Sequence, residues 1–273
     1  MIAGFSVVSL FLILLAGIGA GFVGYAVGAS SLVSYPALLA FGIPPVLANA
    51  TNTVGVMGTG IGGVLGAQRE LKGQAPRVIV YVVIGAIGGV IGAFLLLELD
   101  PSVFEYAAPV LILFSSLVIA VNPRGRMQAK QAAASATAQL RNEPSFDQPV
   151  QPLNQDAWWV WLGVSVVAIY SGYFGAGAGT CALAMLDAAK IGPFHKINAL
   201  KMLIGTGANI TASVVFIVKG AVDWPAAIML CIGCFIGGYI APPITRRIPA
   251  RIMRIAAVIA GIVLTVDLAL KTY

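Results

Sequence analysis

The stretch GIGAGFVGYAVGASSLVSYPALLAFGIPP, residues 17–45, indicates how this chain folds. It lies within residues 1–67, a run that contains no Asp, Glu, Lys or Arg. As a single helix this run would be about 100 Å long, whereas the hydrocarbon core of a bilayer is ~30 Å thick. The chain must therefore turn within the apolar region, and its glycine cluster and Pro36 mark the turns. Ser30–Phe41 is too short to span a bilayer comfortably, so we predict a half-helix or re-entrant segment there.

The composition of the whole chain indicates an integral membrane protein. Of its 273 residues 59% are hydrophobic and 10% are charged, whereas soluble domains have about 25% charged residues. Several further uncharged runs approach the ~20 residues of a membrane-crossing helix, and the strict apolar–polar alternation of a membrane barrel is absent. We therefore predict an all-α integral membrane protein with about 8–10 membrane segments, half-helices included.

An internal duplication runs along the chain. Residues match in order at an offset that stays between 147 and 151, which scattered packing glycines would not produce. We divide the chain into a first transmembrane repeat at 1–123, a polar linker at 124–156 and a second transmembrane repeat at 157–273. The linker has room for a short surface helix around 127–140. The matched pairs include Gly21 with Gly172, Gly24 with Gly175, Gly28 with Gly179, Asn49 with Asn198, Gly58 with Gly207, and Lys72 with Lys219.

The distribution of charge predicts orientation. Lys and Arg lie in short loops, so the topology rule of membrane proteins explains the net charge of +6 better than nucleic-acid binding does. Arg69, Lys72 and Arg77 mark one loop of the first half as cytoplasmic, while in the second half the next loop is the basic one. The halves are therefore predicted to insert with opposite orientation, with residues 70 and 247 on the same membrane face. A parallel arrangement is the alternative, and it would leave four Arg outside.

A glycine-rich break inside the membrane would create an anion site. The break frees backbone N–H groups, and the half-helix that follows directs the positive end of its dipole into the membrane. Hydroxyls of Ser30, Ser31 and Thr180 would share the contact with the N–H groups that follow Gly28 and Gly179. The alternative is close helix packing, which we prefer for two later glycine pairs, Gly85 with Gly89 and Gly233 with Gly237.

Polar side chains inside apolar runs form the second candidate group. A polar run from Asn49 follows two prolines at the start of a predicted helix, and helix capping explains one of its members. In the matching stretch Lys201 takes the place of Asn52, so it would supply a positive charge for an anion. An interfacial Lys that extends to water is the alternative. This group of predicted binding residues comprises Asn49, Thr51, Asn52, Asn198, Lys201 and Asn209.

Acidic, His and Cys residues give weaker signals. Asp187 is a candidate carrier of a coupling proton, although an ion pair with Lys190 is the preferred alternative. A single His and the pair Cys231 and Cys234 lack the further ligands that a metal site needs. The residue patterns of zinc proteases and serine nucleophiles are also absent, so we expect no enzymatic activity, metal or cofactor.

Five motifs keep a characteristic order along the chain. They are a glycine stretch, a Pro-Leu half-helix, an Ala-Thr-Asn-like helix start, a Gly-x-Val-Asp-Trp loop and a late Arg-Arg-x-Pro. Here they are Gly21–Gly28, Pro36-Ala37-Leu38, Ala48–Asn52, Gly220–Trp224 and Arg246–Pro249. With them the chain resembles the sulfite exporter TauE/SafE family over almost its whole length, although Ala26, Ala29 and Ser30 replace glycines that members often have. The resemblance implies transport of sulfur oxyanions or organosulfonates such as sulfite or sulfoacetate.

These features together favour a secondary transporter of small anions in a bacterial inner membrane. The anion would lie near the midplane between the two repeats and cross by alternating access. A coupling proton or sodium ion and a homo-oligomer are compatible with this hypothesis. The alternatives are a passive anion channel and a non-transporting membrane scaffold or assembly protein. We predict that Lys201→Ala lowers anion binding far more than Lys271→Ala does.

Overall fold

The regular elements of the protein are helices. The computed structural model describes residues 6–66, 74–121, 125–126, 129, 133, 152–153, 156–192, 194–245 and 250–272, and no strand occurs within them. This confirms the all-α fold, while most of the linker, including all of positions 127–140 except 129 and 133, lies outside the described residues. The main helices are α1 (Val7–Val27), α2 (Ser31–Ala40), α3 (Pro45–Gly66), α4 (Ala75–Glu98), α5 (Pro101–Val121), α7 (Trp158–Tyr173), α8 (Ala178–Ala188), α9 (Phe194–Val218), α10 (Trp224–Thr245) and α11 (Ala250–Thr272).

Helices before and after the linker follow the same order of long and short elements. The second helix of each half is short, since α2 has 10 residues and α8 has 11. The helices on either side of them, α1, α3, α7 and α9, have 21, 22, 16 and 25 residues. The half-helix predicted at Ser30–Phe41 is therefore present, and so is its counterpart. The division into two repeats stays a prediction, which this order of elements supports.

Glycines bring pairs of long helices into direct backbone contact. A Cβ atom on Gly237 would lie 2.0 Å from the carbonyl oxygen of Ile18, so α10 packs tightly on α1. A Cβ atom on Gly92 would lie 2.2 Å from the carbonyl oxygen of Ile169, so α4 packs in the same way on α7. Gly89 likewise contacts the backbone of α9. Close packing therefore explains the later glycine pairs, as predicted.

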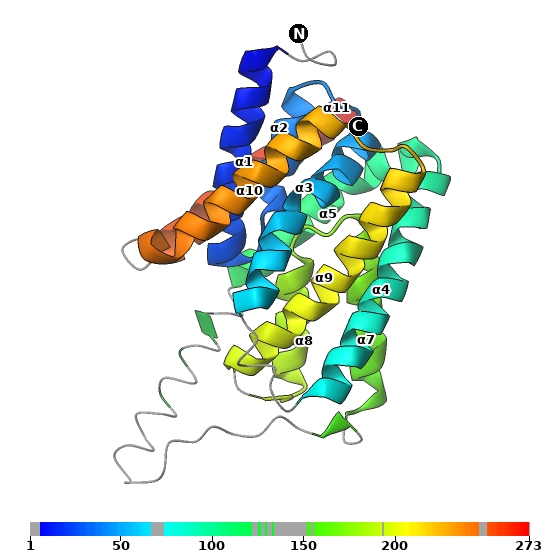
Figure 1. The fold of residues 1–273 in the computed structure, drawn as a ribbon, viewed down its shortest axis with the longest axis vertical. Coiled ribbons are helices and arrows are strands. Elements are labelled where there is room, and N and C mark those ends of the chain that lie inside the picture. Colours follow the sequence, from blue (N-terminus) through cyan, green and yellow to red (C-terminus); the bar gives the residue numbers. More distant parts are fainter. Residues whose placement is uncertain are drawn as a thin grey trace.

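Corresponding helices of the two halves run in opposite directions. Gly17 contacts Leu230 and Gly21 contacts Cys234, so α1 and α10 are parallel, and by the same criterion α4 is parallel to α7 and α9. Residues 219–223 join α9 to α10 in a turn that reverses the chain. Figure 1 shows the result, with α1 descending from the N-terminus and α7 rising from the foot of the molecule. An inverted duplication predicts this antiparallel relation of α1 and α7.

Apolar side chains cover the outside of the helical bundle, while many polar ones lie within it. Phe11, Ile87 and Val263 are 56%, 56% and 62% exposed. In contrast, a set of Asn, Ser and Thr side chains is buried among the helices. Lipid rather than water is the solvent that such a surface requires. Within the part of the chain that the structure describes, four segments are long and apolar enough to cross a membrane, namely Val7–Gly24, Ala75–Glu98, Pro101–Val121 and Ala199–Val218.

Two ion pairs lie at opposite ends of α4. At its start, Arg77 makes a buried two-fold contact with Asp156, at 2.8 and 2.9 Å, and also donates a hydrogen bond to the Tyr81 hydroxyl. Arg77 therefore lies in the first turn of α4, 3% exposed, rather than in the loop before it, and the cytoplasmic location of this end of α4 stays a prediction. At the other end, Lys219 pairs with Glu98 at 2.7 Å on the surface.

Candidate functional site

The first break separates α1 from α2. α1 ends at Val27, and Gly28 has φ = 82°, a left-handed conformation that glycine adopts without strain. The chain then folds back, since Gly19 of α1 lies close to Val33 of α2. Among the hydrogen bonds of the described residues, the backbone N–H groups of Ala29, Ser30 and Ser31 donate none. Three free donors therefore lie at the start of a half-helix.

The second break separates α7 from α8 within the predicted stretch Gly175–Thr180, but it lies before Gly179, the residue after which the free N–H groups were expected. α7 ends at Tyr173, and the left-handed residues are Gly175, with φ = 76°, and Gly177, with φ = 73°. Gly179 is already the second residue of α8, so the chain turns before it rather than at it. The reversal takes two left-handed glycines here but one in the first half. Aligning Gly179 with Gly28 therefore misplaces the turn.

The two breaks meet. A Cβ atom on Gly28 would lie 3.7 Å from Lys201 Nζ and 3.8 Å from Thr180 Oγ1. These three residues come from the end of α1, the first turn of α8 and the second turn of α9. Gly28, before the linker, and Thr180 and Lys201, after it, therefore come together at one place, as the predicted binding set requires.

The groups at this meeting point suit an anion. Thr180 is 5% exposed, and its hydroxyl has no hydrogen-bond partner among the described residues. Lys201 is 9% exposed, and its ammonium lies beside the left-handed turn at Gly28. A hydroxyl, an ammonium and free backbone N–H groups are all donors, and together they match the oxygens of an oxyanion. We refer to Gly28, Thr180 and Lys201 as the break-point site.

The polar side chains near the start of α3 make hydrogen bonds to neighbouring elements, whereas the sequence analysis expected them to bind the anion. The Asn49 amide donates to the Tyr173 carbonyl at 2.7 Å, which ties α3 to the end of α7. The Thr51 hydroxyl accepts a hydrogen bond from the Asp223 amide at 3.0 Å. Asn52 bonds to two serines of α2. Each of these side chains therefore has a structural partner, although the Asn49 carbonyl oxygen is buried without one among the described residues.

Ser31 and Asn52 form a pair that corresponds in sequence to Thr180 and Lys201. Both residue pairs are separated by an offset of 149 positions. In the first half the Asn52 amide donates to the Ser31 hydroxyl at 3.0 Å, and Ser34 also bonds to Asn52. The first half thus has a neutral, hydrogen-bonded pair where the second half has an unsatisfied hydroxyl near a cation. Ser30 takes part through its carbonyl, which accepts from the Ser34 hydroxyl.

The remaining predicted residues lie apart from this contact. Asn209 accepts a long hydrogen bond of 3.5 Å from the Ser171 hydroxyl. Asp187 is half-buried near the end of α8, and no ion pair joins it to the exposed Lys190, so the preferred pairing of these two is wrong. The side chains of Asn198 and Lys271 and the positions 70 and 247 lie outside what the structure describes.

Sequence reasoning missed the side chains that hold the second break in shape. The Tyr170 hydroxyl donates to the carbonyl of Ala176 at 2.6 Å, and the Ser115 hydroxyl bonds to the same oxygen at 2.7 Å. Tyr170 and Ser115 also contact each other at 3.0 Å. A Tyr just before a glycine-rich turn was the available signal, but Ser115 lies in a different half of the chain and no local pattern points to it.

The described residues contain no group of three His, Cys, Asp or Glu side chains that could hold a metal ion. The break-point site itself provides hydrogen-bond donors and one positive charge. Such a site can bind and release a small anion. Its donors come from elements of both halves, so a relative movement of the halves would change their geometry.

Comparisons with known proteins indicate the family to which the chain is similar. The model of the family described as "Sulfite exporter TauE/SafE" matches residues 13–268. A "Probable membrane transporter protein ORF9" from Sinorhizobium sp is 27% identical over 256 residues, covering 91% of this chain and 88% of that protein. A "Probable membrane transporter protein" from Haemophilus influenzae is 24% identical, covering 91% and 90%. The "Probable membrane transporter protein YfcA" from Escherichia coli K12 is 23% identical, covering 91% and 85%. No solved structure matches the chain.

Proposed function

This multi-pass membrane transporter belongs to the sulfite exporter TauE/SafE family, and on that basis we propose that it carries a small anion by alternating access. The observation that supports the anion is the meeting of Gly28, Thr180 and Lys201 at the two helix breaks. The Thr180 hydroxyl and the Lys201 ammonium offer a donor and a positive charge, and the free N–H groups lie in the residues that follow Gly28, so a negatively charged oxygen is the complementary group. We further propose that the membrane is the inner membrane of a bacterium.

Sulfur oxyanions and organosulfonates, such as sulfite and sulfoacetate, are the proposed substrates. Their tetrahedral or pyramidal oxygens accept several hydrogen bonds at once, which suits backbone N–H groups, the Thr180 hydroxyl and the Lys201 ammonium on different elements. Membership of a family of sulfite exporters supports sulfite as one of them. Lys201 supplies charge that partly offsets the cost of removing the anion from water.

The direction of the helices supports alternating access. α1 and α7 are antiparallel, as are α3 and α9, so the two halves offer the same elements to opposite membrane faces. Rocking of one half against the other would expose the break-point site to each face in turn. Asp187 is the proposed carrier of a coupling proton. In proteoliposomes, anion flux that follows an imposed proton or sodium gradient supports a coupled carrier. Flux that follows the anion gradient alone supports a passive channel.

Ligand-dependent thermal stability of the purified protein tests the proposal. A ligand that prefers the folded state raises the melting temperature, so sulfite and sulfoacetate are titrated against chloride as the control anion. Lys201→Ala is expected to weaken the binding of the sulfur anions by about 30-fold or more, since it removes a buried positive charge. Lys190→Asn is the matched control, because Lys190 is exposed and its φ of 53° suits Asn. Equal anion binding by both variants would show that the anion does not bind at the break-point site.

A pair of glycine variants separates the site from general backbone strain. Gly28 and Gly42 have almost the same φ, 82° and 81°, so Ala at either position costs about 1 kcal/mol of stability. A new Cβ atom at Gly28 points toward Lys201 and Thr180, whereas at Gly42 nothing lies within 4 Å. Gly28→Ala is therefore expected to reduce anion affinity while Gly42→Ala leaves it unchanged. The same affinity loss in both variants would contradict a specific role for Gly28.

A further inference from the structure

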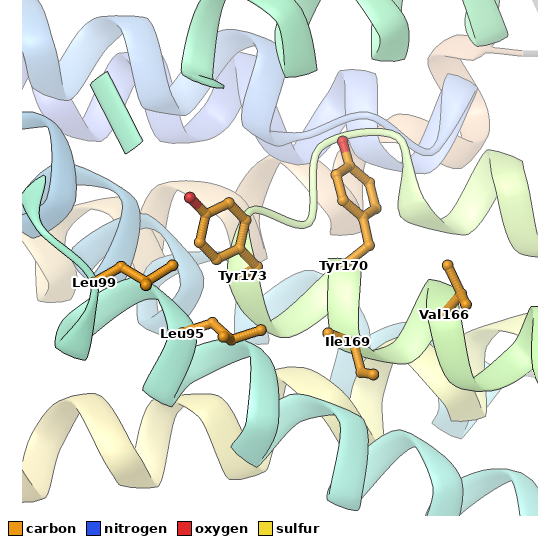
Figure 2. A pocket seen from close by; sticks show the side chains of 6 residues that line it. All are labelled: Leu95, Leu99, Val166, Ile169, Tyr170 and Tyr173. Atoms are coloured by element: carbon orange, nitrogen blue, oxygen red, sulfur yellow. The ribbon is translucent and has the colours of Figure 1, made fainter. Parts of the chain in front are cut away.

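An apolar crevice opens beside the second break, between α4 and α7. Its volume is about 390 Å³, and it is lined by Leu95, Leu99, Val166, Ile169, Tyr170 and Tyr173. Figure 2 shows Leu95 on α4 and Leu99 directly after it, beside Tyr173 at one end of the row of four α7 residues. The α7 residues have the spacing i, i+3, i+4 and i+7, so they form one face of the helix along about 10 Å of its length. The crevice is therefore elongated and follows the helix axis.

The crevice exists because α7 ends early. α7 has 16 residues and ends at Tyr173, which lies against Gly92 of α4. α4 continues to Glu98, so Leu95 and Leu99 lie beyond the tight contact of Gly92 with Tyr173 and border the crevice beside α7. The helix break that forms half of the break-point site thus also leaves a gap in the outer wall of the bundle.

The walls of the crevice exclude a polar occupant. Its four aliphatic residues offer no hydrogen bond, and the Tyr170 hydroxyl is already bonded to Ala176 and Ser115. The crevice is continuous with the lipid-facing surface, since Leu95, Leu99 and Val166 are 41%, 42% and 57% exposed. A hydrocarbon chain from the bilayer is the occupant with matching chemistry, because among the lining residues the Tyr173 hydroxyl alone is left to bond to water.

The charges at the aqueous end of the crevice select the headgroup. Glu98 and Asp100 flank Leu99, and Lys219 neutralises Glu98 at 2.7 Å. Hydrogen bonds from the side chain and the backbone of Ser102 lower the pKa of Asp100, so this carboxylate stays charged. A headgroup with an ammonium, as in phosphatidylethanolamine, is attracted there, whereas the net negative headgroup of phosphatidylglycerol is repelled.

We propose that one acyl chain of phosphatidylethanolamine occupies this crevice and holds the second break in shape. The chain would pack on Tyr170 and Tyr173, and both of these residues make hydrogen bonds at the break. Tyr170 donates to the Ala176 carbonyl, and the Tyr173 carbonyl accepts from Asn49 of α3. Binding of the lipid therefore stabilises the conformation in which the α7–α8 turn is formed and tied to α3. This lipid site is independent of the identity of the transported anion.

Lipid retention by the purified protein tests this inference. Native mass spectrometry compares phosphatidylethanolamine and phosphatidylglycerol with identical acyl chains, and the melting temperature is measured for the same samples. Val166→Trp fills the crevice from a surface position, and Val263→Trp, on the lipid-facing side of α11, is the matched control. Val166→Trp is expected to reduce retained phosphatidylethanolamine roughly tenfold, the loss expected for contacts of about two methylene groups. Val263→Trp should retain it fully.

A further variant tests the headgroup. Asp100→Asn leaves the crevice intact and should abolish the preference for phosphatidylethanolamine over phosphatidylglycerol. Equal retention by wild type, Val166→Trp and Val263→Trp would mean that bound lipid is a general annulus, and it would overturn the proposal. Leu95→Trp fills the crevice from the opposite wall, so it replaces Val166→Trp if that variant does not fold. A preference for phosphatidylglycerol in the wild type would overturn the assignment of the headgroup.

Discussion

Thr180 gives the most direct test at the scale of a residue. Its hydroxyl is buried and lacks a partner among the described residues, which costs stability in the absence of a ligand. Thr180→Val keeps the shape and removes this hydroxyl. We expect the free energy of unfolding of the ligand-free protein to rise by about 1 kcal/mol, and anion affinity to fall about fivefold. Denaturant unfolding and thermal shift with sulfite measure the two effects.

Thr53 provides the control for this substitution. It is also buried, at 4% exposure, but its hydroxyl donates to the Asn49 carbonyl at 2.9 Å. Thr53→Val should therefore destabilise the protein by about 1 kcal/mol and leave sulfite affinity unchanged. A loss of stability of the same size in Thr180→Val would show that the Thr180 hydroxyl is satisfied in the ligand-free protein.

Individual residues of the candidate site were predictable from the sequence to different degrees. Thr180 and Lys201 stood out because polar groups are rare in long apolar runs, and the structure brings them together at Gly28. Asn49 and Asn52 gave the same signal but have structural hydrogen bonds to Tyr173 and Ser31. Sequence cannot separate the two cases, because the partner of a buried polar group is fixed by tertiary contacts.

At the scale of elements, Ala is expected to have opposite effects on stability at two adjacent glycines of α10. A Cβ atom on Gly237 would lie 2.0 Å from the carbonyl oxygen of Ile18 in α1, whereas nothing lies within 4 Å of one on Gly238. Gly237→Ala should therefore destabilise the protein by about 2–3 kcal/mol by forcing α1 and α10 apart. Gly238→Ala should be neutral or stabilise by up to ~1 kcal/mol, since Ala favours helix. Similar melting temperatures of the two variants would contradict this packing.

The helix breaks were predictable as elements, but their positions were only partly so. The glycine density and the charge-free length required a turn near Gly28, and the structure has it there. In the second half the turn lies at Gly175 and Gly177, before Gly179. Several glycines in a row permit several turn positions, and the choice depends on the contact between Tyr170 and the Ala176 carbonyl. That contact is a tertiary feature, so local sequence does not determine it.

At the scale of the molecule, the Arg77–Asp156 pair joins the segment before α7 to the start of α4. Both side chains are buried, at 3% and 0% exposure. Arg77→Ala would leave the Asp156 carboxylate buried without its partner, so we expect a loss of about 3–5 kcal/mol in the free energy of unfolding. Lys219→Ala breaks the exposed pair with Glu98 and should cost less than ~1 kcal/mol. Denaturant unfolding of the two variants measures the difference, and equal losses would contradict it.

Orientation in the membrane is the property of the whole molecule that separates the inverted from the parallel arrangement. Ser6 and Ala157 precede α1 and α7, and both are exposed. Because α1 and α7 run in opposite directions, single cysteines at these two positions should react with a membrane-impermeant reagent from opposite faces. A parallel duplication would place them on the same face. The background for this labelling has Cys181, Cys231 and Cys234 replaced by alanine.

The basic loops predict which end of the helical bundle faces the cytoplasm. Arg69 and Lys72 precede α4, and the four Arg between positions 246 and 254 lie near the end of α10, so the topology rule puts both groups in the cytoplasm. Cysteines at positions 70, 157 and 247 should therefore react in inverted vesicles, and the cysteine at position 6 in intact cells. Reaction of positions 70 and 247 from different faces would contradict the inverted arrangement. It would also remove the argument that one half offers the break-point site to each side in turn, since that argument requires the two halves to be related by inversion.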